Sequence, residues 1–213
     1  MNRIVQLVNE WDSFESEHPD AEIEDFCRYF LARAEQASMS VPAPTATPAG
    51  IPDSGLLLKL MGRIAGAFGV YHRAAMAKTK LPFPDAFFYL NFLKQLGEIR
   101  KTELINSMVA EYTTGMEAIN RLIRDGLIAE RPDENDGRAK LVSLSKRGER
   151  VLAGCYEYVG KAGEMIFKGV RPDTLKLCIA LLSGVEAKHS RLAVELKNRE
   201  FDEMYGAVMN GEA

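Results

Sequence analysis

The sequence predicts a mainly helical fold with one small β-hairpin, an α+β protein in which helices dominate. Apolar residues recur at helical spacing over most of the chain, and alternation of polar and apolar residues is clearest at residues 139–144. Turn-forming residues at 133–138 come directly before that alternating stretch. Prolines and glycines then divide the helical pattern into several separate helices.

The composition is that of an ordinary globular protein. The 213 residues are 46% hydrophobic and 27% charged, and a chain of this size buries roughly 70% of its unfolded surface. It contains no apolar run of about 20 residues, and Glu10 and Asp12 interrupt the N-terminus too early for a signal-peptide core. We therefore expect a cytoplasmic protein without membrane contact.

Cysteines and histidines are few and scattered. None has the spacing of a metal site or of a nucleophile–base pair. We therefore expect no metal, no cofactor and no catalytic residue, which argues against an enzyme. These residues are Cys27, Cys155, Cys178, His18, His72 and His189.

Charge is distributed unevenly along the chain. The net charge is −3, but residues 1–54 hold 3 basic and 10 acidic residues, and residues 55–213 hold 24 basic and 20 acidic residues. Acidity is therefore concentrated in the N-terminal segment. The remainder of the chain can present a basic face to nucleic acid.

The first 54 residues form a separate region. Helices are predicted over 2–17 and 20–37, and together they make an acidic helical appendage over residues 1–37. Residues 38–54 hold four of the nine prolines and predict an extended linker.

Four helices and a hairpin follow the linker. The helices are expected over 56–78, 84–96, 100–110 and 114–125. Two short strands are then expected, followed by a long helix and by a second helical stretch that is interrupted at Ser183-Gly184. Their ranges are 127–132, 139–144, 145–168 and 172–209.

Two short helices joined by a tight turn and followed by a hairpin describe a winged helix-turn-helix. We place this DNA-binding domain at residues 81–145. The long flanking helices, over residues 55–80 and 146–209, are expected to form a dimerisation region. The predicted architecture is thus a winged helix-turn-helix domain flanked by long dimerisation helices.

Residues 56–199 resemble the MarR family, the multiple-antibiotic-resistance regulators. The resemblance rests on Arg131-Pro-Asp-Glu-Asn-Asp-Gly-Arg138, which is followed by Leu141-Val-Ser-Leu-Ser-Lys-Arg-Gly148. That segment is similar to the family's wing, with an Arg, an Asp-x-Arg at the tip and an apolar strand leading into a helix. Upstream, Arg124-Asp-Gly-Leu-Ile128 and Glu103-Leu104 are similar to the family's entry into the wing and into the helix-turn-helix.

The resemblance implies a transcription regulator that binds double-stranded DNA at a pseudo-palindromic operator. It also implies a homodimer whose N- and C-terminal helices interlace, and a response to a small phenolic or lipophilic effector. Residues 1–37 and the linker lie outside the resemblance.

A recognition helix reads base edges with its N-terminal half, which defines the candidate DNA contacts. Arg138 at the wing tip is expected to enter the minor groove, or to pair with Asp133 or Asp136. The wing's Lys140, with Lys146 and Arg147 after it, suits a phosphate or remains a solvated charge. The candidates on the recognition helix are Thr113, Thr114, Gly115, Glu117, Asn120 and Arg121.

Two of these candidates have structural alternatives. Thr114-Gly-Met-Glu117 fits a capping box, in which Glu117 binds the backbone at the helix start rather than a base. Arg121 is either a phosphate or guanine contact or a solvated helix charge.

An effector pocket is expected where the helical region meets the winged helix. Tyr71, His72, Phe88 and Tyr89 are the candidate lining residues, with ordinary core packing as the alternative role.

Two alternative functions remain open from the sequence. One is a winged helix used as a protein-interaction module, since residues 99–150 hold 10 basic and 9 acidic residues. The other is an oxidant-sensing regulator that acts through one of the three cysteines. A steep salt dependence of DNA affinity would exclude the first, and DNA release by peroxide would support the second.

Overall fold

The computed structural model describes residues 2–38 and 52–211, apart from the side chains of residues 35–38 and 137–138. The chain divides into two compact units, residues 1–59 and 60–213. Most of the predicted linker, 39–51, lies outside the described residues. At its two edges the prediction was wrong, because Ser38 ends one helix and Asp53 begins the next.

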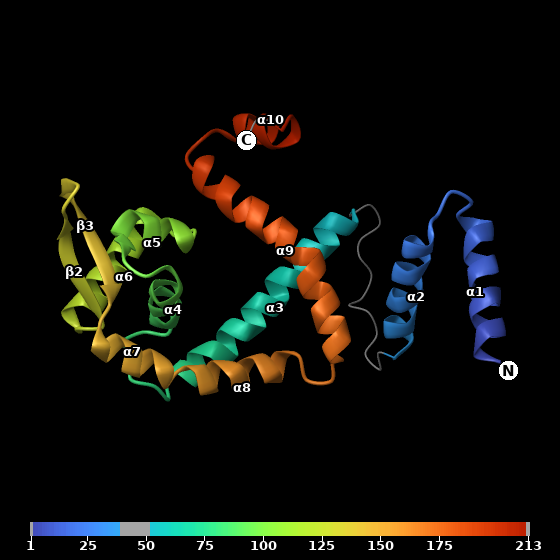
Figure 1. Cartoon of the computed structure of the whole chain (residues 1–213), viewed down its shortest axis with the longest axis horizontal. Coiled ribbons are helices and arrows are strands. Elements are labelled where there is room, and N and C mark those ends of the chain that lie inside the picture. Colours follow the sequence, from blue (N-terminus) through green and yellow to red (C-terminus); the bar gives the residue numbers. More distant parts are fainter. Residues whose placement is uncertain (1, 39–51, 212–213) are drawn as a thin grey trace. The chain divides into compact units, whose positions relative to one another are not determined.

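The N-terminal unit contains the helices α1 (Arg3–Glu17) and α2 (Ile23–Ser38) (Figure 1). Aromatic rings hold them together: Phe14 lies 5.6 Å from Phe26 and 4.9 Å from Tyr29, measured between ring centroids. Arg33 on α2 binds Glu10 on α1 at 2.9 Å. Two helices with so few buried side chains have a small core.

The second unit begins within α3, and the helices and strands of the winged helix follow this helix. Their order is α3 (Asp53–Met76), α4 (Ala86–Leu96), β1 (Ile99–Arg100), α5 (Lys101–Ser107), α6 (Tyr112–Arg124), β2 (Ile128–Asp133) and β3 (Asp136–Leu144). Four helices complete the chain: α7 (Lys146–Ala153), α8 (Tyr156–Ile166), α9 (Pro172–Glu195) and α10 (Phe201–Met209). None of the helices in the described ranges is long and apolar enough to cross a membrane.

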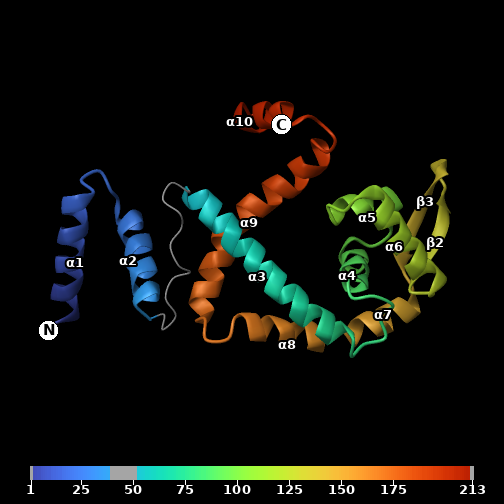
Figure 2. The same cartoon turned by 180° about the vertical axis from the view of Figure 1, so that it is seen from behind.

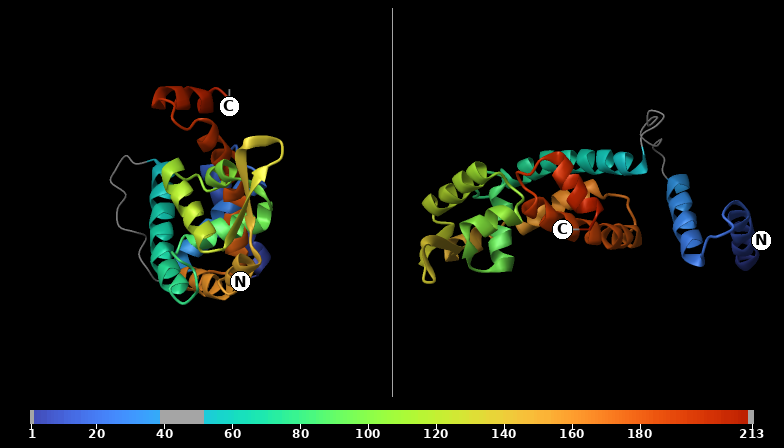
Figure 3. Two further views of the ribbon diagram at one scale, coloured as in Figure 1. Left: turned by 90° about the vertical axis from the view of Figure 1, so that its left-hand side faces the viewer. Right: turned by 90° about the horizontal axis from the view of Figure 1, so that it is seen from above.

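The sheet has three antiparallel strands in the order β1-β3-β2. The β2–β3 hairpin can be followed from the sides in Figure 3. The sequence predicted only this hairpin and began a helix at Arg100, which was wrong. Ile99 and Arg100 instead pair with Val142 and Leu141 on β3. The Arg100 N–H then donates to Glu103 Oε2 at 3.1 Å, which fixes the start of α5.

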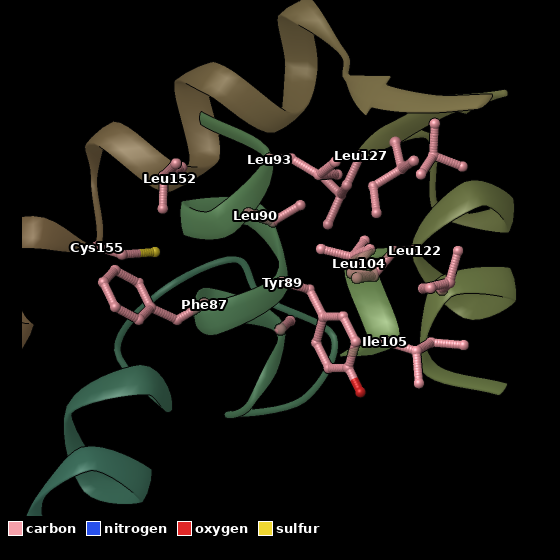
Figure 4. Close-up of a cluster of buried hydrophobic side chains, with 14 of the residues drawn as sticks. Phe87, Tyr89, Leu90, Leu93, Leu104, Ile105, Leu122, Leu127, Leu152 and Cys155 are labelled. Carbon is pink, nitrogen blue, oxygen red and sulfur yellow. The ribbon is translucent and has the colours of Figure 1, made fainter. Parts of the chain in front are cut away.

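The core of the second unit surrounds α4. Ala86, Leu90 and Leu93 on this helix are at most 2% exposed. In Figure 4 the leucine side chains of α4 point toward those of α5, α6 and the start of β2, and Phe87 lies beside Cys155. The buried side chains that meet them are Leu104, Ile105, Ile119, Leu122, Leu127, Val142 and Leu152.

Two boundaries of the C-terminal helices differ from the prediction. The helix expected over 145–168 breaks between α7 and α8, where Cys155 N–H bonds to the Leu152 carbonyl in a tighter turn. Conversely, α9 continues through Ser183-Gly184. The Ser183 hydroxyl donates to the Ile179 carbonyl one turn earlier at 2.6 Å, a contact that often accompanies a bend in a helix. Figure 2 shows that α9 bends along its length without being interrupted.

Gly148 packs the first turn of α7 against the wing. Ser145 caps that turn by accepting from the Gly148 N–H at 2.9 Å. A Cβ atom at position 148 would lie 2.1 Å from the Leu127 carbonyl oxygen and 2.8 Å from Leu144 Cδ1. The backbone that leads into β2 therefore leaves no room for a side chain at this position.

We predict that Gly148→Ala destabilises the protein by about 2–4 kcal/mol, because the methyl group forces the helix away from a fixed backbone carbonyl. Gly160→Ala in α8 is the matched control, since a Cβ there meets nothing within 4 Å. That control should raise helix propensity and stabilise by about 0.5–1 kcal/mol. Urea unfolding measures both, and equal effects of the two substitutions would contradict the packing described.

Candidate nucleic-acid interface

The exposed half of α6 presents a short polar surface. Thr113, Thr114 and Glu117 are exposed, and they lie within the first two turns. The helix begins at Tyr112 with Glu111 at the N-cap position, two residues before the predicted start. The predicted capping box was therefore wrong, since Thr114 already lies inside the helix. The Glu117 carboxylate is left on the surface that would face DNA.

Gly115 does not belong to that surface. The residue is buried, and a Cβ there would lie 2.7 Å from Ile105 Cγ1. Its small size allows α6 to approach α5 closely, so we correct its assignment from DNA contact to helix packing.

Asn120 and Arg121 on α6 both form hydrogen bonds to neighbouring segments of the winged helix. Lys101 Nζ on α5 donates to Asn120 Oδ1 at 3.1 Å. Arg121 Nη2 donates to the Pro82 carbonyl at 2.7 Å, and its guanidinium lies 5.1 Å from the Phe83 ring centroid. Arg121 thus joins α6 to the segment before α4. The side chain remains exposed, so a DNA contact and a solvated charge both stay predictions, and this hydrogen bond competes with a DNA contact.

A buried carboxylate anchors the wing to β1. Arg100 donates to Asp133 Oδ2 through Nε at 3.0 Å and Nη2 at 2.8 Å. The Asn135 N–H donates to Asp133 Oδ1 at 2.9 Å. This hydrogen bond and the Arg100 guanidinium hold the pKa of the Asp133 carboxyl below its usual range. The Arg138 side chain lies outside the described atoms. Asp133, one of the two partners expected for it, is bound by Arg100.

Carboxylates also hold other cations at the wing. Glu130 binds Lys101 at 2.8 Å and Lys140 at 3.2 Å, and these lysines lower the pKa of the Glu130 carboxyl. Arg131 Nε donates to Glu98 Oε2 at 2.9 Å. Lys140, a predicted phosphate contact, is thus exposed and paired at the same time.

A lysine just beyond the C-terminal end of α9 binds the turn between α5 and α6. Lys197 Nζ donates to the Ala110 carbonyl at 2.7 Å. The preceding Val109 has φ +48°, a conformation that branched side chains rarely adopt. Sequence reasoning missed this contact because the two residues lie 87 positions apart.

A cleft of about 820 Å³ opens between the segment leading into α4 and the exposed face of α6. Phe88 and Tyr89 line it, together with Glu117 and Arg121. The cleft lies within the winged helix, however, and not where the helical region meets it, which is where the sequence placed the effector pocket. Burial and the neighbouring Asp85 raise the pKa of the Tyr89 phenol.

Tyr71 and His72, which the sequence also placed at the pocket, do not line this cleft. The His72 ring is 2% exposed and stacks on Phe88 with 4.8 Å between centroids. Its Nε2 lies 3.2 Å from the Pro84 carbonyl oxygen. His72 therefore packs α3 against α4.

Only one of the three cysteines is placed unfavourably for the oxidant-sensing alternative. Cys155 is buried, its Sγ donates to the Val151 carbonyl at 3.1 Å, and burial raises the pKa of its thiol. Cys27 and Cys178 are exposed. No group of three or more metal-ligating side chains occurs in residues 2–38 and 52–211.

The geometry defines a winged helix, and comparison with known proteins agrees with it. A family model described as a winged helix DNA-binding domain matches residues 84–148. No curated protein matches the chain.

Solved structures extend the likeness to the flanking helices. A MarR family transcriptional regulator from Silicibacter pomeroyi DSS is 27% identical, with a TM-score of 0.57, and the match covers 70% of this chain and 99% of that one. A mutant MarR of E. coli complexed with operator DNA is 19% identical (TM-score 0.56; 62% and 95% covered). Bordetella bronchiseptica BpsR, whose structure concerns regulation of DNA binding by 6-hydroxynicotinic acid, is 20% identical (TM-score 0.56; 62% and 98% covered).

The chain therefore carries a winged helix DNA-binding domain. More particularly, it has the regulator fold of the MarR family, which confirms the resemblance seen in residues 56–199. That family consists of transcription regulators and not of enzymes.

We predict that Asp133→Asn destabilises the protein near neutral pH and that the difference disappears in acid. The folded-state pKa of Asp133 is depressed, so its stabilisation is present above the ordinary Asp pKa of about 3.9 and is lost as pH falls through the lower folded value. Urea unfolding at pH 7 and below pH 3 measures the change. A difference between Asp133→Asn and wild type that is equally large at both pH values would contradict this prediction.

Proposed function

We propose that this protein is a transcription regulator that binds double-stranded DNA as a homodimer at a pseudo-palindromic operator. The observation that carries the proposal is the exposed face of Thr113, Thr114 and Glu117 at the start of α6, beside an anchored wing. Hydroxyls and free backbone N–H groups at a helix N-terminus suit phosphate oxygens and base edges. The operator complex of the structurally similar MarR supports this use of the fold.

Each half of the operator would be read by one α6 and one wing. The two recognition helices of a dimer bind half-sites about one turn of DNA apart. On the wing, Lys140 would exchange Glu130 for a phosphate, and Arg138 would reach the minor groove from β3, near the hairpin tip. Glu117 would accept from a cytosine amine or repel phosphates, which restricts the sequences that bind.

We predict that Arg138→Ala weakens operator binding about 10- to 100-fold, the equivalent of 1–3 kcal/mol, and lowers the slope of log K against log salt by about one. Arg28→Ala in α2 removes an exposed arginine outside the domain and should leave affinity unchanged. Fluorescence anisotropy with the chain's own upstream DNA, at several salt concentrations, measures both. An Arg138→Ala protein with wild-type affinity would remove this residue from the interface.

The same titration tests the function as a whole. Tight, salt-sensitive binding to a palindromic segment supports the regulator. Absence of binding by a folded dimer, even at low salt, would favour a protein-interaction module.

Exposed apolar residues on the flanking helices support the homodimer. On α3, Leu58 is 69% and Ile64 is 47% exposed, and on α9, Leu181 is 59% and Val185 is 56% exposed. Apolar side chains repeated along two long helices are typical of a surface that a second subunit covers.

We predict that Leu181→Asp shifts the protein from dimer to monomer, because each subunit loses about 1.5–3 kcal/mol of apolar burial and must desolvate a charge. Ser183→Asp, on another face of the same helix, adds the same charge and should remain dimeric. Sedimentation velocity measures the state, and circular dichroism checks that both variants are folded. A Leu181→Asp dimer as tight as wild type would place the interface elsewhere.

An effector is proposed for the cleft that Phe88 and Tyr89 line. Aromatic and apolar walls fit a small lipophilic or phenolic effector, and the charged lining residues Asp85, Glu117, Arg121 and Arg124 offer polar contacts of both signs. An occupant there would touch Glu117 and Thr114 of the recognition helix directly. Regulation of the similar BpsR by 6-hydroxynicotinic acid, an aromatic acid, agrees with this chemistry.

A further inference from the structure

A second cleft, of about 500 Å³, lies between the turn that follows α3 and one face of α7. All its charged lining residues are cations: two lysines from the turn and two arginines from the helix. The complete lining is Lys78, Thr79, Lys80, Arg147, Arg150, Val151 and Gly154.

The local structure directs these cations toward one hollow. Residues 147, 150, 151 and 154 are spaced three and four apart, so they share one face of the helix and the turn that ends it. Val151 and Gly154, which carry small side chains or none, complete the lining on the α7 side. On the other wall, the Thr79 hydroxyl donates to the Met76 carbonyl at 2.7 Å and fixes the turn that holds the lysines.

None of the four cations forms an ion pair with a residue of the described ranges 2–38 and 52–211. Within those ranges, the only hydrogen bond from one of these side chains is internal to α7, from Arg150 Nε to the Lys146 carbonyl at 3.3 Å. The wing cations, in contrast, are held by carboxylates at 2.8–3.2 Å. Glu149 is exposed on α7 and does not line the cleft.

Such a cluster is electrostatically unfavourable without an anion. Charges closer than the Debye length of about 8 Å repel one another at physiological salt. Arg147 and Arg150 are also neighbours at i, i+3, where like charges destabilise a helix. A multiply charged anion in the cleft would remove this repulsion and connect the turn after α3 to α7.

We propose that the cleft binds a small oligophosphate anion, with a pyrophosphate or triphosphate group as the recognised chemistry. Arginine forks bind phosphate oxygens in pairs, and lysines add point charges from the opposite wall. The lining has no aromatic ring on which a nucleobase could stack, so the phosphate chain itself is the recognised part. The volume lies within the range of about 300–1,000 Å³ found for small-molecule sites.

The competing occupant is the DNA backbone. The sequence suggested Arg147, which follows the wing, as a DNA phosphate contact, and the structure places its side chain in the lining of this cleft. Cations that converge from two elements on one hollow fit a compact anion better than a continuous duplex.

The test is isothermal titration of the full chain with sodium tripolyphosphate, in chloride buffer of matched ionic strength. We expect saturable binding of one anion per chain. Arg147→Gln/Arg150→Gln and Lys78→Gln/Lys80→Gln should each weaken binding at least tenfold. Both variants should keep or raise the thermal midpoint, because they remove repulsion. Lys161→Gln/Arg191→Gln, which removes two exposed cations outside the cleft, should bind within twofold of wild type.

Three results would overturn the proposal. The first is the absence of saturable binding. The second is an equal loss of affinity in the control variant, which would mean general attraction to positive charge. The third comes from DNA titrations of Lys78→Gln/Lys80→Gln. A salt slope lowered by about two would assign these cations to the DNA backbone, whereas the small-anion site leaves the slope unchanged.

Discussion

Burial of α4 is the constraint on which the second unit depends. Its apolar side chains pack on α5, α6, β3 and α7, so one short helix sets the positions of both the recognition helix and the wing. Close contacts elsewhere serve the same arrangement: Gly115 lets α6 approach Ile105, and Gly148 lets α7 approach the backbone at Leu127, just before β2. The exposed polar face of α6 is thus held by packing on its opposite side.

Polar contacts complete what packing begins. Arg121 ties α6 to Pro82, and Lys197 ties the turn before α6 to the end of α9. The strained Val109 lies beside that second contact. Residues far from the proposed DNA surface can therefore alter it, since the turn between the two helices is attached to a flanking helix.

The sequence was sufficient for the helix order and the hairpin, because long apolar periods and turn residues identify them. Prediction from the sequence failed where contacts between distant residues determine an element or the role of a side chain. Two residues of β1 are too few to show a period, and Glu111 is not a residue type that marks a helix start, so α6 was placed too late. Gly115 gave no sign of which way it faced, and the carbonyl partner of Arg121 lies 39 residues away.

If the protein is the DNA-binding regulator proposed above, the ion pairs of its wing bear on how it finds one site on a chromosome. Arg100, Arg131 and Lys140 are each already neutralised by a carboxylate. Bulk DNA, which offers on the order of 10⁶–10⁹ competing positions, attracts proteins mainly through unpaired cations. If these lysines and arginines exchange their carboxylates for phosphates only at a matching operator, the protein would bind non-specific DNA more weakly. Few copies per cell would then suffice to occupy an operator.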